Sequence, residues 1–316
     1  MLTTQPKHSR TVVVGAGTMG VDVAIVLARG GSQVTLVEPS SIRRDAVALH
    51  VQTNLEAMGL GHRSALVSCV STLDEVKWSG VTMVVECVPE NLPVKQALFA
   101  ELVERADQAT VLASNSSSFP ISAIGQGLDT THRMVGLHFF MPAHLVPLVE
   151  VVLGPHTDAA LADSVCTYMR GCGNVPVLVR KDKPGFLANR LQHALAREAF
   201  ALIDEGVATP EDVDAAVRFG FGFRFLAAGP VMQRDHAGLD VHCAAAATMY
   251  PSLAANHAPA LALSERVAQG KLGMKSGEGF YRWTSDTRQA ERDRYDQLLR
   301  QGLALIADEL PQIDRS

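Results

Sequence analysis

The sequence lacks several features that would indicate particular classes of protein. Its 316 residues include only five cysteines, and no pair of them has the spacing of a metal site, so we predict no bound metal. The odd cysteine count and the polar start, residues 1–10, without an apolar signal core, lead us to expect a cytoplasmic protein with free thiols. No apolar run approaches the ~20 residues of a membrane helix, so we expect no membrane partner.

The sequence also lacks a large excess of charge of either sign. The formal net charge of −5 gives no general basic field, and we therefore expect no nucleic-acid partner. Apolar residues make up 47% and charged residues 19% of the chain, which is typical of a globular protein with a large core. The length favours two domains, and we find neither a repeat nor a low-complexity tract.

The most informative stretch is residues 11–20, TVVVGAGTMG. A β-branched apolar run leads into Gly-x-Gly-x-x-Gly and then into a helical pattern, which predicts a buried strand, a tight turn and a helix. Gly15 would permit the turn, Gly17 would let the backbone approach a pyrophosphate, and Gly20 would let the helix pack closely on the strand. The helix N-terminus would offer free N–H groups and a partial positive charge to that anion.

A second predicted strand, residues 33–37, ends at Glu38. A carboxylate at that place can accept hydrogen bonds from a ribose and would repel a 2′-phosphate, which favours NAD. Arg43 and Arg44 follow closely enough to leave NADP open as an alternative. Asp22 lies in the first turn of the predicted helix, near the expected phosphate.

The first half of the chain alternates short apolar runs with helical patterns, which is typical of a parallel sheet. The pattern changes near Asp182, where we place a domain boundary between residues 1–182 and 183–316. Beyond it we predict helices, one over residues 186–205 with Leu191, Leu195 and Leu202 on one stripe. The further strands expected in the first half are residues 65–70, 81–86, 110–113, 133–138, 148–152 and 175–179.

Two further helices have clear signals. Thr209 is a good N-cap before Pro210 and two acids, so a helix should begin there. Residues 286–310 carry leucines and an isoleucine on one face and charges opposite, which predicts an amphipathic closing helix.

Ligands of open α/β sheets lie beyond the carboxyl ends of the strands, where this sequence places polar side chains. Ser117 lies in a Ser/Asn run after one predicted strand, His138 ends another, and Glu150 lies in the next. Asn189 lies about 200° around its predicted helix from Leu191, away from the leucine stripe.

These residues suit the oxidation of an alcohol. Histidine can accept the hydroxyl proton, and a carboxylate can orient it, so His138 and Glu150 form a candidate pair. Ser117 and Asn189 could hold the reacting oxygen. Each also has a structural alternative: a lone histidine can be structural, and a Ser/Asn run can be a turn or a helix cap.

The chain resembles the NAD-dependent L-3-hydroxyacyl-CoA dehydrogenase family, nearly from end to end. The resemblance is carried by eight stretches: residues 15–20, 85–95, 113–118, 136–142, 148–152, 182–190, 238–240 and 275–281. It implies an α/β fold, with a Rossmann-type, mostly parallel sheet followed by an all-helical C-terminal domain that forms substrate and dimer contacts.

The resemblance also implies roles for individual residues. His138 would be the catalytic base with Glu150 as its partner, and Ser117 and Asn189 would contact the reacting end of the substrate. The reaction would be the reversible oxidation of a 3-hydroxy to a 3-oxo group on a 3-hydroxyacyl-CoA or a small 3-hydroxy acid. NAD would be held by Gly15, Gly17, Thr18, Met19, Gly20, Glu38, Glu90, Lys95 and Asn115.

Departures from the family pattern bear on the substrate. Met141 stands where the family has asparagine, and the region after Leu55 is short, which leaves Arg43, Arg44, His62 and Arg63 as basic candidates for CoA phosphates. Residues 219–225, FGFGFRF, resemble the branch that oxidises small acids such as L-carnitine, L-gulonate and pyridine carboxylates. We hypothesise that Arg224 binds a substrate carboxylate, with an ordinary ion pair as the alternative.

Two alternatives to this function remain open at the sequence level. The same base could act on the hydrate of an aldehyde of a small carboxylate. The chain could also be a non-catalytic, crystallin-like NAD-binding protein, although the intact set of four polar residues favours an enzyme. We expect a homodimer.

Overall fold

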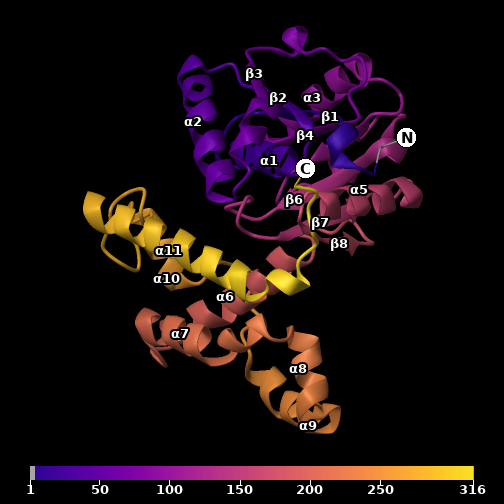
Figure 1. Cartoon of the computed structure of the whole chain (residues 1–316). Helices are drawn as coiled ribbons and strands as arrows, with labels where there is room; N and C mark the ends of the chain where they lie inside the picture. The colour runs from indigo at the N-terminus through magenta and orange to yellow at the C-terminus, as the bar shows by residue number, and fades with distance from the viewer. Residues whose placement is uncertain (1–3, 316) are drawn as a thin grey trace. The chain divides into compact units, whose positions relative to one another are not determined.

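The computed structural model describes residues 4–315 and divides into two compact units (Figure 1). One unit comprises Met1–Asn189 with Ala307–Ser316, and the other Arg190–Ile306. The first three residues of the polar start lie outside the described range. The domain boundary near Asp182 stays a prediction.

The first unit is built on a single eight-stranded sheet in the order β3-β2-β1-β4-β5-β6-β7-β8. Every neighbouring pair is parallel except β6 and β7, which are antiparallel, so the predicted mostly parallel sheet is confirmed. The strands are β1 (Arg10–Val14), β2 (Gln33–Val37), β3 (Val67–Val70), β4 (Met83–Glu86), β5 (Val111–Ser114), β6 (Met134–Phe139), β7 (Leu148–Leu153) and β8 (Val175–Val179).

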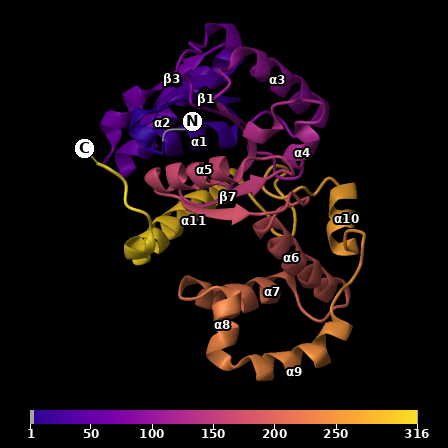
Figure 2. The ribbon, with the colours of Figure 1, turned by 90° about the vertical axis from the view of Figure 1, so that its right-hand side faces the viewer.

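Helices cover both faces of this sheet because its strands are apolar on both sides. Val13, Leu36 and Val85 belong to one core with α1, α2 and α5. Val12 and Val84, one position away, belong to a second core with α3 and α4 (Figure 2). The helices are α1 (Thr18–Arg29), α2 (Ser41–Ala57), α3 (Leu92–Arg105), α4 (Ile121–Ile124) and α5 (Ala159–Gly171).

Two predicted strands, β3 and β4, begin two residues later than expected, at Val67 and Met83. Residues 65 and 66 belong to the 3₁₀ helix η2 (Gly61–Leu66), and β3 begins at Val67. The Arg63 N–H donates to the Leu60 carbonyl, and the Ser64 hydroxyl donates to the Gly61 carbonyl, so local turn bonds replace strand pairing there.

The second unit is helical, as predicted. The Thr209 N-cap is confirmed, since its side chain and that of Asp212 form a capping box. Phe280, between α10 and α11, stacks on Phe200 of α6 and lies under the guanidinium of Arg266 of α10, so these segments pack together. Its helices are α6 (Ala188–Asp204), which begins in the first unit, α7 (Pro210–Ala216), α8 (Pro230–Ala237), α9 (Leu239–Met249), α10 (Leu261–Ala268) and α11 (Ser285–Leu305).

Short helical turns connect these elements. They are η1 (Pro6–His8), η3 (Leu73–Glu75), η4 (Thr131–Arg133), the π-turn η5 (Val217–Phe221), η6 (Phe223–Leu226), η7 (Tyr250–Ser252) and η8 (Ala307–Glu309).

The closing helix ends at Leu305, five residues before the predicted end. The chain then returns to the first unit, where Ile313 packs against the core and Arg63 donates to the Asp314 carbonyl. In residues 4–315, no helix has the length and apolar character needed to cross a membrane.

Candidate active site

The glycine turn after β1 has the form of an anion-binding cradle. Gly15 has a φ of +99°, a conformation that side chains disfavour, and a Cβ on Gly20 would lie only 1.7 Å from the Gly15 carbonyl oxygen. A Cβ on Gly17, in contrast, would meet nothing within 4 Å. Gly17 is also the N-cap of α1 and supplies no capping side chain, so the first amides of the helix remain available to a ligand.

Glu38 follows β2 at the edge of this cradle and is 3% exposed. Its carboxylate accepts the Ala16 N–H at 3.0 Å and the Ser40 N–H at 2.9 Å. Burial opposes ionisation, but these two bonds and the positive charge of Arg43 outweigh it, so the pKa of Glu38 is lowered. The group therefore presents a negative charge where a ribose would bind.

The two arginines after Glu38 are already engaged. Arg43 Nη1 lies 3.3 Å from Glu38 Oε2, and Arg44 Nη1 donates to the carbonyls of Glu38 and Pro39. Arg43 keeps a side chain that is 61% exposed. The arrangement matches a ribose-binding acid better than a site for a 2′-phosphate.

His138 and Glu150 are brought together by the antiparallel pairing of β6 with β7, in which they are direct partners. His138 Nδ1 lies 2.8 Å from Glu150 Oε2, and both side chains are buried. Burial raises the pKa of Glu150, but the bonds from His138 and from two backbone amides outweigh it, and the pKa is lowered. Since an ionised carboxylate only accepts hydrogen bonds, Nδ1 carries the proton.

The second oxygen of Glu150 holds the start of α6. It accepts the Leu187 N–H at 3.0 Å and the Ala188 N–H at 2.8 Å. Asn189, the next residue, is half-buried and belongs to the same compact unit as the pair. Glu150 thereby ties the histidine to the helix that carries Asn189.

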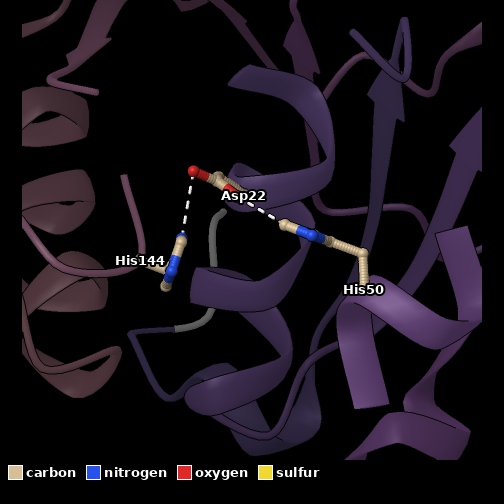
Figure 3. Close-up of side chains that lie close together, drawn as sticks. All are labelled: Asp22, His50 and His144. Atoms are coloured by element: carbon tan, nitrogen blue, oxygen red, sulfur yellow. Dashed lines mark hydrogen bonds and ion pairs between the residues drawn. The ribbon is translucent and has the colours of Figure 1, made fainter. Parts of the chain in front are cut away.

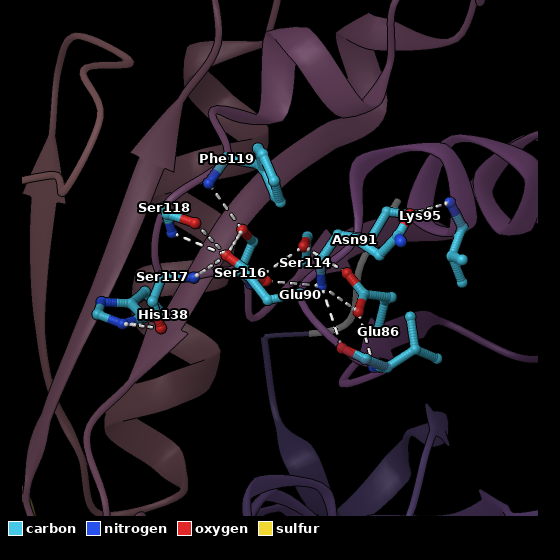
Figure 4. Close-up of polar contacts among 12 residues, drawn as sticks. Glu86, Glu90, Asn91, Lys95, Ser114, Ser116, Ser117, Ser118, Phe119 and His138 are labelled. Carbon is cyan, nitrogen blue, oxygen red and sulfur yellow. Dashed lines mark hydrogen bonds and ion pairs between the residues drawn. The ribbon is translucent and has the colours of Figure 1, made fainter. Parts of the chain in front are cut away.

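Ser117 completes the arrangement at the free nitrogen of His138. Its hydroxyl lies 3.2 Å from Nε2, and because Nδ1 carries the proton, the hydroxyl donates to Nε2 (Figure 4). The structure thus brings His138, Glu150 and Ser117 into one chain of hydrogen bonds. Nε2 is the atom that can accept a further proton.

Glu90 organises the serine turn in front of this histidine. Its Oε1 accepts bonds from the Ser116 hydroxyl at 2.7 Å and the Ser118 hydroxyl at 2.6 Å, and from the Ser117 N–H at 3.2 Å. Burial opposes ionisation, but the bonds from Ser116 and Ser118 and the charge of Lys95 lower the pKa of Glu90 to about 2. Glu90 therefore positions the backbone that presents Ser117.

Lys95 and Asn115, two predicted cofactor residues, also bond within this turn. Lys95 is 1% exposed, with its Nζ 2.7 Å from Glu86 Oε1 and 3.2 Å from Glu90 Oε2. Asn115 Oδ1 accepts the Phe139 N–H at 2.9 Å and so links the ends of β5 and β6.

Sequence reasoning missed Glu86, which is fully buried and also accepts a 2.6 Å bond from Ser114. The available signal was an acid in an apolar strand, as for Glu150, because a buried carboxylate requires partners.

The predicted substrate residues outside this cluster have different surroundings. Arg224, in η6 of the second unit, is exposed, and its guanidinium forms no ion pair with any residue from 4 to 315. Of the four basic candidates for CoA phosphates, Arg63 is buried, and its guanidinium donates to the carbonyls of Arg29 and Asp314. His62 is exposed.

A mostly parallel, doubly wound sheet, a glycine turn that leads into a helix and an acid at the end of β2 together define a dinucleotide-dependent dehydrogenase. The comparisons with known proteins agree. The model described as "3-hydroxyacyl-CoA dehydrogenase, NAD binding domain" matches residues 10–183, and "3-hydroxyacyl-CoA dehydrogenase, C-terminal domain" matches residues 185–283. The chain belongs to the 3-hydroxyacyl-CoA dehydrogenase family and is an NAD-dependent oxidoreductase.

Three relatives illustrate the range of this family. A 5-formyl-3-hydroxy-2-methylpyridine 4-carboxylate 5-dehydrogenase of Mesorhizobium japonicum is 37% identical over 290 residues, 89% of this chain and 94% of the relative. The mitochondrial hydroxyacyl-coenzyme A dehydrogenase of Homo sapiens is 34% identical over 293 residues, 88% of this chain and 91% of the relative. A solved 5-formyl-3-hydroxy-2-methylpyridine 4-carboxylic acid 5-dehydrogenase, described as an NAD⁺-dependent dismutase, superposes with a TM-score of 0.88 at 31% identity, covering 95% of this chain and 98% of that chain.

Proposed function

We propose that this protein oxidises a hydroxyl group of a small carboxylic acid, a 3-hydroxy acid in the first instance, with His138 as the general base. The observation that carries the proposal is the chain Glu150–His138–Ser117, which leaves Nε2 as the proton acceptor. Bound NAD⁺ supplies the acceptor for the hydride. The residues of this chain bind the substrate hydroxyl group, and Nε2 of His138 takes its proton.

Glu150 keeps the base in its working state. A carboxylate at Nδ1 holds the imidazole in the tautomer with a free Nε2, and it stabilises the imidazolium that forms when Nε2 takes the proton. We assign the binding of the reacting substrate oxygen to Ser117 and Asn189, since a hydroxyl and an amide can donate hydrogen bonds to the charge that develops on that oxygen. The Ser117 contact to Nε2 supports this assignment for the serine.

The residues around the glycine turn fit a dinucleotide. Glu38 would bind the adenosine ribose, while the turn would hold the pyrophosphate. Glu90, Lys95 and Asn115 line the serine turn beside His138, which supports a place for them next to the reacting end of the cofactor. In the turn itself, we assign the cofactor contacts to Gly15, Gly17, Thr18, Met19 and Gly20.

Three observations favour a small acid over a CoA thioester. Arg63 is committed to two backbone carbonyls and is not free for a phosphate. Met141 stands where the family pattern has asparagine, so this position supplies no side-chain amide beside the base. Arg224 has an exposed guanidinium that forms no ion pair within residues 4–315, which suits a substrate carboxylate.

A second candidate reaction is the oxidation of an aldehyde hydrate, in which Nε2 would take a proton from a gem-diol hydroxyl. It is favoured by the likeness to the pyridine-carboxylate dehydrogenase, which extends over 95% of this chain. Product analysis separates the two reactions, because the hydroxy acid yields a ketone and the hydrate yields an acid.

The test is NADH formation, followed by fluorescence, with NAD⁺ and a panel of small 3-hydroxy acids, aldehydes of small carboxylates and 3-hydroxyacyl-CoA esters. We expect the free acids or aldehydes to be turned over and the CoA esters to be poor substrates. Arg224→Leu should raise KM for the preferred substrate by at least about tenfold, the value of one charged hydrogen bond. Preference for CoA esters, or an unchanged KM, would contradict the substrate assignment.

We further propose a cytoplasmic homodimer formed through the helical domain, residues 183–316. Support comes from the apolar side chains that this region leaves exposed, among them Leu191 at 59%, Phe219 at 72% and Val231 at 77%. Light scattering should give twice the chain mass, and Val231→Asp should shift it toward the monomer. A monomeric wild-type protein would contradict the proposal.

A further inference from the structure

Three side chains from separate elements converge beside the glycine turn, outside the proposed catalytic chain. Asp22 comes from α1, His50 from α2, and His144 from the loop between β6 and β7 (Figure 3). Asp22 Oδ1 lies 3.0 Å from His50 Nε2, and Asp22 Oδ2 lies 3.0 Å from His144 Nδ1. The ligand atoms of the three side chains all lie within 4.8 Å of one another.

Hydrogen bonding explains only part of this cluster. Asp22 accepts the Ala143 N–H at 3.1 Å and is bonded to His50, so those groups are satisfied. His144 is 5% exposed, yet among residues 4–315 neither of its ring nitrogens has a partner with hydrogen-bond geometry. Nδ1 is near the carboxylate without the geometry of a hydrogen bond. The imidazole thus has only the Asp22 carboxylate beside Nδ1 and no partner at Nε2, which is costly for a buried ring and points to a further ligand in this cluster.

The spacing of the donors suits a small cation. Zinc binds imidazole nitrogen and carboxylate oxygen at about 2.0–2.2 Å, which places neighbouring ligand atoms about 3.3 Å apart in a tetrahedral site. The two 3.0 Å separations, one from each imidazole to a different oxygen of the Asp22 carboxylate, are close to that value. Two imidazoles and one carboxylate favour Zn²⁺ or a similar transition metal, because Mg²⁺ and Ca²⁺ prefer sites made of oxygen.

Access and charge are also compatible with a bound cation. The His50 side chain is 46% exposed, whereas those of Asp22 and His144 are buried, so a cation could enter from the His50 side. One carboxylate and two neutral imidazoles would leave part of the charge of a divalent ion uncompensated. Since α1 begins at the glycine turn, that positive charge would lie near the predicted pyrophosphate.

We propose that Asp22, His50 and His144 bind one divalent transition-metal ion, with Zn²⁺ as the best match, and leave a fourth position for water. The ion would pin α1 and α2 to the loop that follows β6, and so would stabilise the cofactor side of the first unit. This role is separate from the proton transfer at His138. It also departs from the sequence-based expectation of no metal.

The experiment uses full-length, untagged protein that has been stripped with a chelator and titrated with Zn²⁺ against a chromophoric competitor. We expect one Zn²⁺ per wild-type chain. His50→Gln and Asp22→Asn should each weaken binding by more than about 100-fold, since even outer partners of metal ligands are worth 10–100-fold. Added Zn²⁺ should raise the Tm of the wild type but not of His50→Gln.

His50 is half-exposed, so His50→Gln should keep its fold, which NAD binding and circular dichroism can verify. The matched control is His156→Ala, because His156 is an exposed histidine outside the cluster and should bind Zn²⁺ as the wild type does. Cobalt gives a second readout, since its visible absorption should appear with wild type and vanish with Asp22→Asn. Equal Zn²⁺ affinity in wild type and His50→Gln, or loss in His156→Ala, would overturn the proposal.

Discussion

His138 and Glu150 are opposite partners in the antiparallel pair β6–β7, and their side chains meet at 2.8 Å between Nδ1 and Oε2. The reversal of β7 makes this contact possible, because antiparallel pairing sets the end of β6 beside the start of β7. The residues between them include Pro142 and Pro147, which interrupt the strands and turn the chain back. The pair therefore lies at the edge of the sheet where the parallel strands end.

The first prediction concerns the base. His138→Ala should lower kcat by about 10²–10⁴, the usual contribution of general acid–base catalysis, while NAD binding stays near the wild-type value. Steady-state kinetics on the best substrate of the panel, together with cofactor fluorescence titration, measures both. His156→Ala, an exposed histidine, is the control. Rates near wild type in His138→Ala would remove the assignment.

The second prediction concerns cofactor choice. Glu38→Ser removes the acid that would bind the ribose and frees Arg43 from its ion pair, so kcat/KM with NAD should fall and that with NADP should rise. A change of about 10- to 100-fold in the ratio corresponds to one charged hydrogen bond. In Glu38→Ser/Arg43→Leu the gain with NADP should disappear. An unchanged ratio in the single variant would show that Glu38 does not select the cofactor.

The third prediction concerns the buried ion pair of Lys95 with Glu86, which are 1% and 0% exposed. Lys95→Met should lower the free energy of unfolding by about 3–5 kcal/mol, because it leaves a buried carboxylate without its cation. The double variant Lys95→Met/Glu86→Gln should recover part of that loss, since the remaining side chain is neutral. Urea denaturation measures both, and equal stability of Lys95→Met and wild type would contradict the expected coupling.

The fourth prediction concerns acid stability. The pKa of Glu90 falls from 4.5 to about 2 on folding, so the folded protein binds fewer protons there than the unfolded chain. The contribution of ionised Glu90 to the free energy of unfolding is fully present above about pH 4.5 and is lost as the pH falls toward about 2. Glu90→Gln should therefore flatten the decline in unfolding free energy below pH 4.5. Glu104→Gln, at an exposed acid, should keep the wild-type slope, and an unaltered slope in Glu90→Gln would rule out the linkage.

Much of the fold could be predicted because its signals are local. The alternation of apolar strands and helices predicted a mostly parallel sheet, and Thr209 with Pro210 predicted the start of α7. The errors were local too. Residues 65 and 66 have strand-like composition, but turn bonds beside Gly61 place them in a 3₁₀ helix.

The sequence by itself determined the glycine turn and the acid after β2, because neighbouring residues fix these features. It also offered His138 and Glu150 as a candidate pair, but their contact depends on the antiparallel pairing of β6 with β7. Only the tertiary structure decided that Glu90 would gather three serines and that Lys95 would be buried with Glu86. It alone brought Asp22, His50 and His144 together. The physical reason is that such contacts join segments far apart in the chain, and the packing of helices on the sheet, rather than any local spacing, sets their distances.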